Sequence, residues 1–161
     1  MTRILVIHDG LTCCGIAATL TRMGYATIEA YSAATGIRAA REVDPDLVLV
    51  GFRLPDHDGL SVLAALREAD PALPVVLLSS RRTRWIEHGA LRLGARACLD
   101  TPIDAATLAA IVAWEAKTSA RPPQEREVES GRRCRDQETN TDTVLATVAA
   151  NRLPGAGWTT R

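Results

Sequence analysis

Five short apolar runs, each of strand length and each followed by a segment with helical spacing, constrain the fold of this chain most. The runs are Arg3 to His8, Tyr25 to Ala30, Leu47 to Val50, Val75 to Leu78 and Ala95 to Leu99. Apolar residues between and after these runs recur at helical spacing, as from Arg82 to Leu93 and from Ala105 to Lys117. Such alternation predicts an α/β fold with a parallel sheet and helices on both of its faces.

The composition divides the chain into two parts. Residues 1–117 contain all five strand–helix pairs and are predicted to form one domain. Residues 118–161 begin with a polar and charged stretch that contains Pro122-Pro123, and we expect this tail to be a largely disordered linker. Hydrophobic residues make up 47% of the whole chain, which excludes a fully disordered protein.

The cysteine pattern and the length of the apolar runs indicate in which cellular compartment the protein is expected. The four cysteines (Cys13, Cys14, Cys98 and Cys134) show no Cys-x-x-Cys spacing, and the first residues lack the apolar core of a signal peptide. No apolar run approaches the roughly 20 residues that a membrane span needs. We therefore expect a cytoplasmic protein with free thiols and no membrane contact. The formal net charge of zero gives no overall bias toward nucleic acid.

The stretch from Pro45 to Leu60 reads P-D-L-V-L-V-G-F-R-L-P-D-H-D-G-L. It resembles the pattern P-D-L-V-L-L-D-x-x-M-P-x-x-D-G-L of receiver domains from two-component response regulators. The resemblance of the framework runs from about Arg3 to Lys117 and implies a flavodoxin-like, doubly wound sheet with the strand order 2-1-3-4-5.

The residues that carry receiver chemistry depart from this pattern. Gly51 stands where the resemblance implies the phosphate-accepting aspartate, and a glycine has no carboxylate to act as nucleophile. Where the resemblance implies two acidic residues after the first strand, this chain has His8-Asp9. Where it implies a lysine after the fifth strand, this chain has Thr101. Ser79 keeps the hydroxyl that ends the fourth strand, whereas Cys98 replaces the aromatic switch residue. The sequence therefore predicts a receiver framework without conventional phosphorylation.

These departures also weaken the magnesium site that the resemblance implies. Magnesium prefers oxygen ligands, and Asp9 beside an imidazole, with no carboxylate at position 51, makes a weak site. The only lysine of the chain is Lys117, so no earlier lysine can replace the one absent at Thr101. We expect no metal, no cofactor and no enzymatic activity.

Fold topology would bring His8, Asp9, Gly51, Ser79 and Thr101 together as a degenerate pocket. One hypothesis is that the pocket senses a small ligand or a proton, because histidine titrates near neutral pH. The alternative is a pocket whose polar groups bond to one another and to water. Cys13 and Cys14, at the expected start of the first helix, are open to a redox or metal role or to simple burial.

A partner surface is implied by the same resemblance. Receivers commonly use the fourth helix, fifth strand and fifth helix to contact a partner or a second copy, and Trp85, Cys98 and Trp114 fall on these elements. Exposed tryptophans would suit such an interface, and core packing is the alternative for both.

One short stretch of the tail resembles a second family. Residues 121–128, R-P-P-Q-E-R-E-V, are similar to the opening of a LuxR-type helix-turn-helix, T-P-R-E-R-E-V-L. The roughly 50 residues of periodic helices that should follow are missing, so DNA binding by this chain is not expected. The match is interpreted as a possible vestige of an output domain.

Three functions remain open. The first is a signalling module of bacterial signal transduction or transcription regulation that acts through protein contacts without aspartyl phosphorylation. The second is a pseudo-receiver that binds a small ligand in the emptied pocket around Gly51. The third is a receiver phosphorylated on a non-standard residue, with Asp9, Asp56 and Asp58 as candidates.

Overall fold

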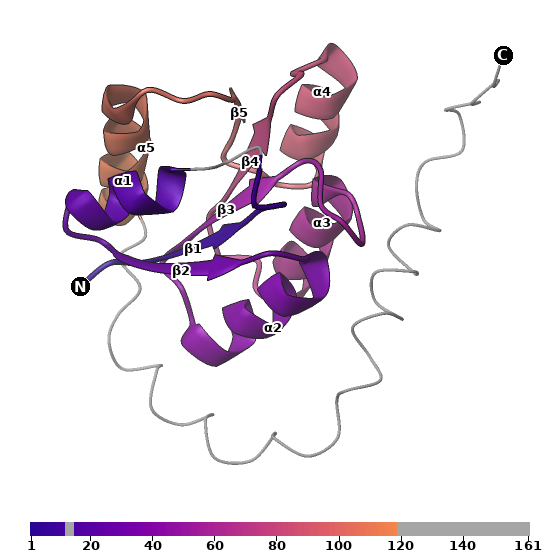
Figure 1. The fold of residues 1–161 in the computed structure, drawn as a ribbon. Helices are drawn as coiled ribbons and strands as arrows, with labels where there is room; N and C mark the ends of the chain where they lie inside the picture. The colour runs from indigo at the N-terminus through magenta and orange to yellow at the C-terminus, as the bar shows by residue number, and fades with distance from the viewer. Residues whose placement is uncertain (12–14, 119–161) are drawn as a thin grey trace, which may run out of the picture.

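The computed structural model describes residues 1–11 and 15–118, and a five-stranded parallel sheet forms its centre (Figure 1). The strands are β1 (Arg3–Ile7), β2 (Ala26–Ala30), β3 (Leu47–Gly51), β4 (Val75–Ser79) and β5 (Ala97–Asp100). Their order is β2-β1-β3-β4-β5, and all neighbouring pairs run parallel. The predicted α/β class and strand order are confirmed.

Five helices connect the strands and cover both faces of the sheet. They are α1 (Ile16–Arg22), α2 (Ala33–Val43), α3 (Gly59–Ala69), α4 (Arg84–Arg92) and α5 (Ala105–Thr118). Helices α1 and α5 lie together on one face, and α2, α3 and α4 lie on the other (Figure 1).

The central strands explain why their sequences are apolar throughout. Successive side chains of a strand point to opposite faces, so a strand with helices on both sides is buried on both. In β3, Val48 and Val50 pack with the α2–α3–α4 side, whereas Leu47 and Leu49 pack with α1 and α5. All four side chains are at most 1% exposed.

The strand registers bring three loops to one edge of the sheet. Ile7 of β1 pairs with Val50 of β3, and Gly51 of β3 pairs with Leu78 of β4. The three strands therefore end side by side, and the loops after β1, β3 and β4 must meet there.

Helix α4 begins later than the sequence predicts. It starts at Arg84 rather than Arg82, because Thr83 is extended, with φ −101° and ψ 156°. Arg82 instead reaches the neighbouring strand, where its Nη1 donates a hydrogen bond of 3.3 Å to the Cys98 carbonyl. The loop before α4 is thus tied to β5.

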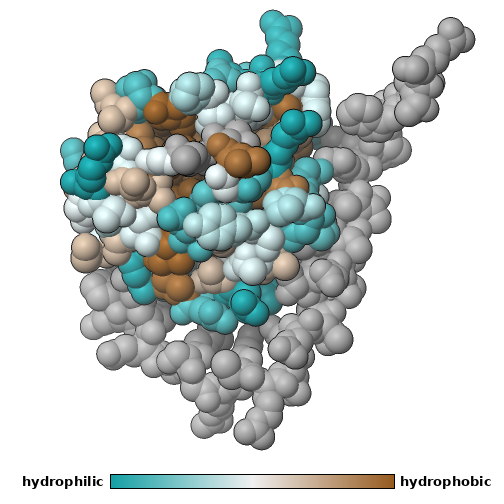
Figure 2. Space-filling view, in the orientation of Figure 1, coloured by the Kyte–Doolittle hydropathy of each residue, from teal (hydrophilic) through white to brown (hydrophobic). Residues whose placement is uncertain are grey.

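The surface agrees with a domain built around an internal core. On the coloured part of the face in Figure 2, groups of hydrophobic residues are separated by hydrophilic ones. Every helix in the described ranges is too short or too polar to span a bilayer.

Candidate functional site

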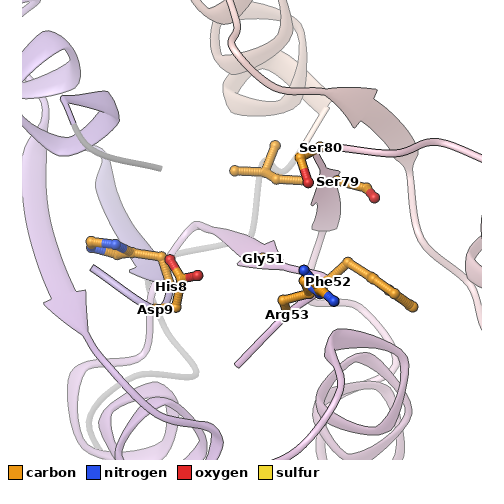
Figure 3. Close-up of a pocket in the computed structure, with 8 residues that line it drawn as sticks. His8, Asp9, Gly51, Phe52, Arg53, Ser79 and Ser80 are labelled. Carbon is orange, nitrogen blue, oxygen red and sulfur yellow. The ribbon is translucent and has the colours of Figure 1, made fainter. Parts of the chain in front are cut away.

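A shallow recess lies where the loops after β1, β3 and β4 meet (Figure 3). The space between its lining atoms is about 230 Å³, a figure that includes open solvent, so little of it is enclosed. The residues that line it are His8, Asp9, Gly51, Phe52, Arg53, Leu78, Ser79 and Ser80. Four of the five predicted pocket residues are therefore together, and Thr101 is not among the lining residues.

Gly51 ends β3 at the floor of this recess, and nothing steric requires a glycine there. Its φ is not positive, and a Cβ atom would lie 3.5 Å from the nearest heavy atom, the Ile7 carbonyl oxygen. Gly59 is different, because a Cβ atom there would overlap the Gly51 carbonyl oxygen and the Phe52 Cα. The Gly59 N–H donates to the Phe52 carbonyl at 2.7 Å, so the loop closes by direct backbone contact. Position 51 therefore has room for a Cβ atom at ordinary contact distances.

His8 lines the recess, but its ring points away from Gly51 (Figure 3). The ring is turned toward β2, where Nε2 lies 2.9 Å from a Glu29 carboxylate oxygen. The other ring nitrogen, Nδ1, accepts a 3.0 Å hydrogen bond from the Gly10 N–H. Because Nδ1 is an acceptor, Nε2 carries the ring hydrogen and donates a hydrogen bond to the Glu29 carboxylate. His8 is 4% exposed, so its ring is a buried structural group rather than a pocket group.

Glu29 links His8 to a third side chain. The Tyr31 hydroxyl donates to the same Glu29 oxygen at 3.3 Å, and its ring meets the His8 ring edge-on at 5.0 Å. The charge of Glu29, then desolvation and this hydrogen bond, raise the pKa of Tyr31 above its ordinary 10.0. This cluster was not predicted from the sequence, since it depends on the pairing of β1 with β2, which places Glu29 opposite Val6.

Two hydroxyl residues behave differently at this edge. Ser79 is 3% exposed, and its Oγ accepts a 3.2 Å hydrogen bond from the Arg81 N–H. Thr101 donates its N–H to the Ser79 carbonyl at 3.0 Å. The Thr101 hydroxyl is itself buried, and no hydrogen-bond partner for it lies in the described part of the chain. The backbone thus joins the two loops, while only Ser79 faces the recess.

Comparison with known proteins identifies this arrangement. The pattern of the response regulator receiver domain matches residues 4–113, which is more than half of the chain. The chain belongs to the receiver domain family. Its topology and the placing of the recess at the carboxyl ends of β1, β3 and β4 are consistent with this membership.

The chain is similar to two transcriptional regulatory proteins and to one receiver domain of known structure. The chain is 40% identical over 96 residues to the transcriptional regulatory protein KdpE of Mycobacterium tuberculosis, covering 59% of this chain and 42% of KdpE. It is 32% identical over 102 residues to the transcriptional regulatory protein ZraR of Salmonella typhimurium, covering 63% of this chain and 23% of ZraR. The receiver domain of NtrX from Brucella abortus superposes with a TM-score of 0.67 at 28% identity, covering 71% and 98% of the two chains. The match thus spans less than half of either full-length regulator.

The residues of this receiver do not fit the magnesium ion that the family implies. Gly51 offers no carboxylate, and the His8 ring is committed to Glu29 and Gly10. Asp9 remains, and one of its oxygens accepts a 2.9 Å hydrogen bond from the Leu11 N–H. Within residues 1–11 and 15–118, no three His, Cys, Asp or Glu side chains are grouped to hold a metal.

Asp56, a candidate for an alternative acceptor, holds the start of α2. Its carboxylate accepts hydrogen bonds from the Ala33 and Ala34 N–H groups at 2.8 and 3.0 Å and from the His57 N–H at 3.1 Å. Desolvation alone would raise the pKa of Asp56, but these bonds, with the nearby His57, lower it below its ordinary 3.8. Both oxygens therefore serve a helix N-terminus.

Asp58, another candidate acceptor, caps α3 in the same loop. Its Oδ1 accepts 2.8 and 3.0 Å hydrogen bonds from the N–H and hydroxyl of Ser61. Of the two aspartates that follow β3, one thus stabilises the first turn of α2, which precedes the strand, and the other that of α3, which follows the loop.

Two of the predicted partner residues are exposed beside the edge strand β5, and their role in a contact surface stays a prediction. Trp85 and Trp114 are 49% and 58% exposed, and they lie on α4 and α5, which cover opposite faces of the sheet. Cys98 is 5% exposed and packs in the core beside α4, so its assignment to a contact surface is wrong. Burial raises the pKa of the Cys98 thiol, and the positive charge of the nearby Arg82 offsets part of that rise in pKa.

Three further predictions lie outside the described residues. They concern Cys13 and Cys14, the tail from residue 119 onward, and the resemblance of residues 121–128 to a helix-turn-helix opening.

Proposed function

We propose that this chain is a receiver domain that signals through protein contacts and accepts no phosphoryl group at the end of β3. Gly51 carries the proposal, since the position accepts a Cβ atom without overlap but a glycine provides no nucleophile. We further propose that the chain serves transcription regulation and has no catalytic activity of its own, as KdpE and ZraR are named transcriptional regulators.

The surrounding residues support the same conclusion. A phosphoryl group at this edge would need cations to offset its charge. The receiver lysine is replaced by Thr101, and the residues present do not fit magnesium. The other loop aspartates, Asp56 and Asp58, already accept hydrogen bonds from helix N-termini.

Incubation with acetyl phosphate and magnesium, followed by intact-mass measurement, tests the proposal. We expect no mass increase by one phosphoryl group, while a conventional receiver treated in parallel gains it. Beryllofluoride should leave the NMR spectrum around Gly51 unchanged. A stable phosphoprotein would refute the proposal, and its loss in Asp9→Asn, Asp56→Asn or Asp58→Asn would then identify the acceptor.

A second function is favoured by the recess itself. Ser79, Ser80, Arg53 and Asp9 line the space beside Gly51 and offer hydroxyl groups and charges of both signs to a small polar ligand. A panel of metabolites should then contain one that raises the melting temperature. Gly51→Leu, which fills the space, should abolish that rise, whereas Glu68→Gln at an exposed site of α3 should not. A panel without any such metabolite would count against this function.

A further inference from the structure

The last turn of α5 contains a buried carboxyl group. Glu115 lies three and seven positions after the buried Val112 and Leu108, so the three side chains form one row on the inner side of the helix. The Glu115 side chain is 2% exposed, although a glutamate is almost never fully buried unless it is paired. An ionisable group therefore occupies a row that is otherwise apolar.

Arg96 is the cation beside this carboxyl group. It directly precedes β5, and its N–H donates a 2.8 Å hydrogen bond to the Val75 carbonyl, so its backbone is fixed to the start of β4. Its Nε lies 3.7 Å from the Glu115 Oε2, which is too long for a hydrogen bond. This buried oxygen has no hydrogen-bond partner within residues 1–11 and 15–118. The ionised carboxylate is therefore only partly compensated, because a buried charge needs hydrogen bonds as well as an opposite charge.

The elements packed against α5 bring other charges to the same edge of the sheet. Helix α5 shares a core cluster with α1, β1, β3, β4 and β5. The charged or titratable side chains that lie at or near the amino ends of these strands are Arg3, Arg22, Tyr25, Asp46, Arg96 and, on α5 itself, Lys117. Desolvation raises the pKa of Glu115 above its ordinary 4.5, and of these side chains only Arg96 offsets part of that rise. The folded chain therefore favours the neutral form of Glu115 more than the unfolded chain does.

We propose that Glu115 is a proton-operated latch on the last turn of α5. The protonated carboxyl group is neutral and stays in the apolar contact between α5 and the sheet, so it holds the turn in place. The ionised group is drawn toward water, which loosens the turn. Residues 119–161 continue from this turn, so the latch makes the start of that segment sensitive to pH. The proposal goes beyond the proposed function, because Arg96 and Glu115 lie at the edge of the sheet opposite to Gly51.

Titration of the carboxyl group itself tests the first step. The carbon-13 signal of the Glu115 side chain is followed by NMR from pH 3 to pH 8 in the full-length chain. We expect its pKa to lie above 4.5. Arg96→Gln should raise that pKa further, because the opposing positive charge is removed. A pKa at or below 4.5 in the wild type would overturn the proposal.

Urea unfolding at pH 4 and pH 7 compares the wild type with Glu115→Gln, which keeps the shape of the neutral carboxyl group. All other titrating groups are common to both chains and cancel in the difference. Because the folded chain binds the proton more tightly, the wild type should lose stability relative to the variant as pH rises, about tenfold in the unfolding equilibrium for each unit of the rise in pKa. A permanently ionised ion pair gives the opposite sign, with Glu115→Gln losing most at pH 7. Glu68→Gln, at an exposed site of α3, is the matched control and should show a smaller trend.

Hydrogen exchange locates the loosening. Protection factors, which are corrected for the intrinsic effect of pH on exchange, should be several-fold lower at pH 7 than at pH 4 for the amides of residues 115–118. In Glu115→Gln the protection of this turn should be the same at both pH values. Equal protection in the wild type, or a larger stability loss of Glu115→Gln at pH 7 than at pH 4, would overturn the proposal. The carboxyl titration and the wild-type exchange need no variant, so they decide the matter even if Glu115→Gln does not fold.

Discussion

Removing the Asp56 side chain tests how the loop after β3 holds the neighbouring helix. The carboxylate satisfies the first two N–H groups of α2, while Ser32 accepts from the third, Thr35, at 3.2 Å. Loss of one helix cap costs about 0.5–2 kcal/mol. The Asp56 side chain is 29% exposed, so water can replace part of what is lost. For two N–H groups we expect Asp56→Ala to lower the free energy of unfolding by about 2 kcal/mol at pH 7.

The pH dependence gives this prediction a second test. The pKa of Asp56 is lowered in the folded state, so its contribution is complete above the ordinary value of 3.8 and is lost as pH falls through the lowered value. Urea unfolding at pH 7, 5 and 3 should therefore give an unchanged difference between wild type and Asp56→Ala at the first two values, and a smaller one at the third.

The control removes a carboxylate that caps no helix. Glu68 is exposed on α3, and Glu68→Gln should change the free energy of unfolding by less than about 0.5 kcal/mol. Equal stabilities of wild type and Asp56→Ala at pH 7 would refute the capping argument. So would a difference that stays constant down to pH 3, because the carboxylate charge would then play no part.

Three further predictions concern two glycines and the cluster beside β2. Gly51→Ala should raise the free energy of unfolding by up to about 1 kcal/mol, because the added methyl meets only ordinary contacts and the unfolded chain loses freedom. Gly59→Ala should lower it by roughly 2 kcal/mol through overlap with the loop backbone; comparable urea midpoints for the two variants would contradict this difference. Glu29→Gln should lower the pKa of Tyr31 toward 10.0, measured by tyrosinate absorbance with Tyr25 as the only other tyrosine. An unchanged titration curve would show that Glu29 is not the cause.

The fold could be predicted from sequence because its signals are local. Runs such as Leu47 to Val50 are buried on both faces only in a sheet with helices on each side, and the strand order came from the family resemblance. The start of α4 was less predictable, since it depends on the contact between Arg82 and the distant Cys98 carbonyl.

The site was predictable in its backbone but not in its side chains. The ends of β1, β3 and β4 fix the positions of Asp9, Gly51 and Ser79. The direction of the His8 ring depends on Glu29 of another strand, which no local pattern reveals. Cys98 was assigned to the surface by analogy, and its burial follows from which face of β5 it occupies.

The backbone closure of the β3–α3 loop has a consequence for how such a chain can change over generations. The contact between Gly59 and Phe52 holds the loop without any help from a side chain at position 51. Two of the four glycine codons become an aspartate codon by one base change at the second position. A lineage could therefore lose or regain the acceptor group in a single step while the domain stays folded, and the proteins docked on it would face the same scaffold throughout.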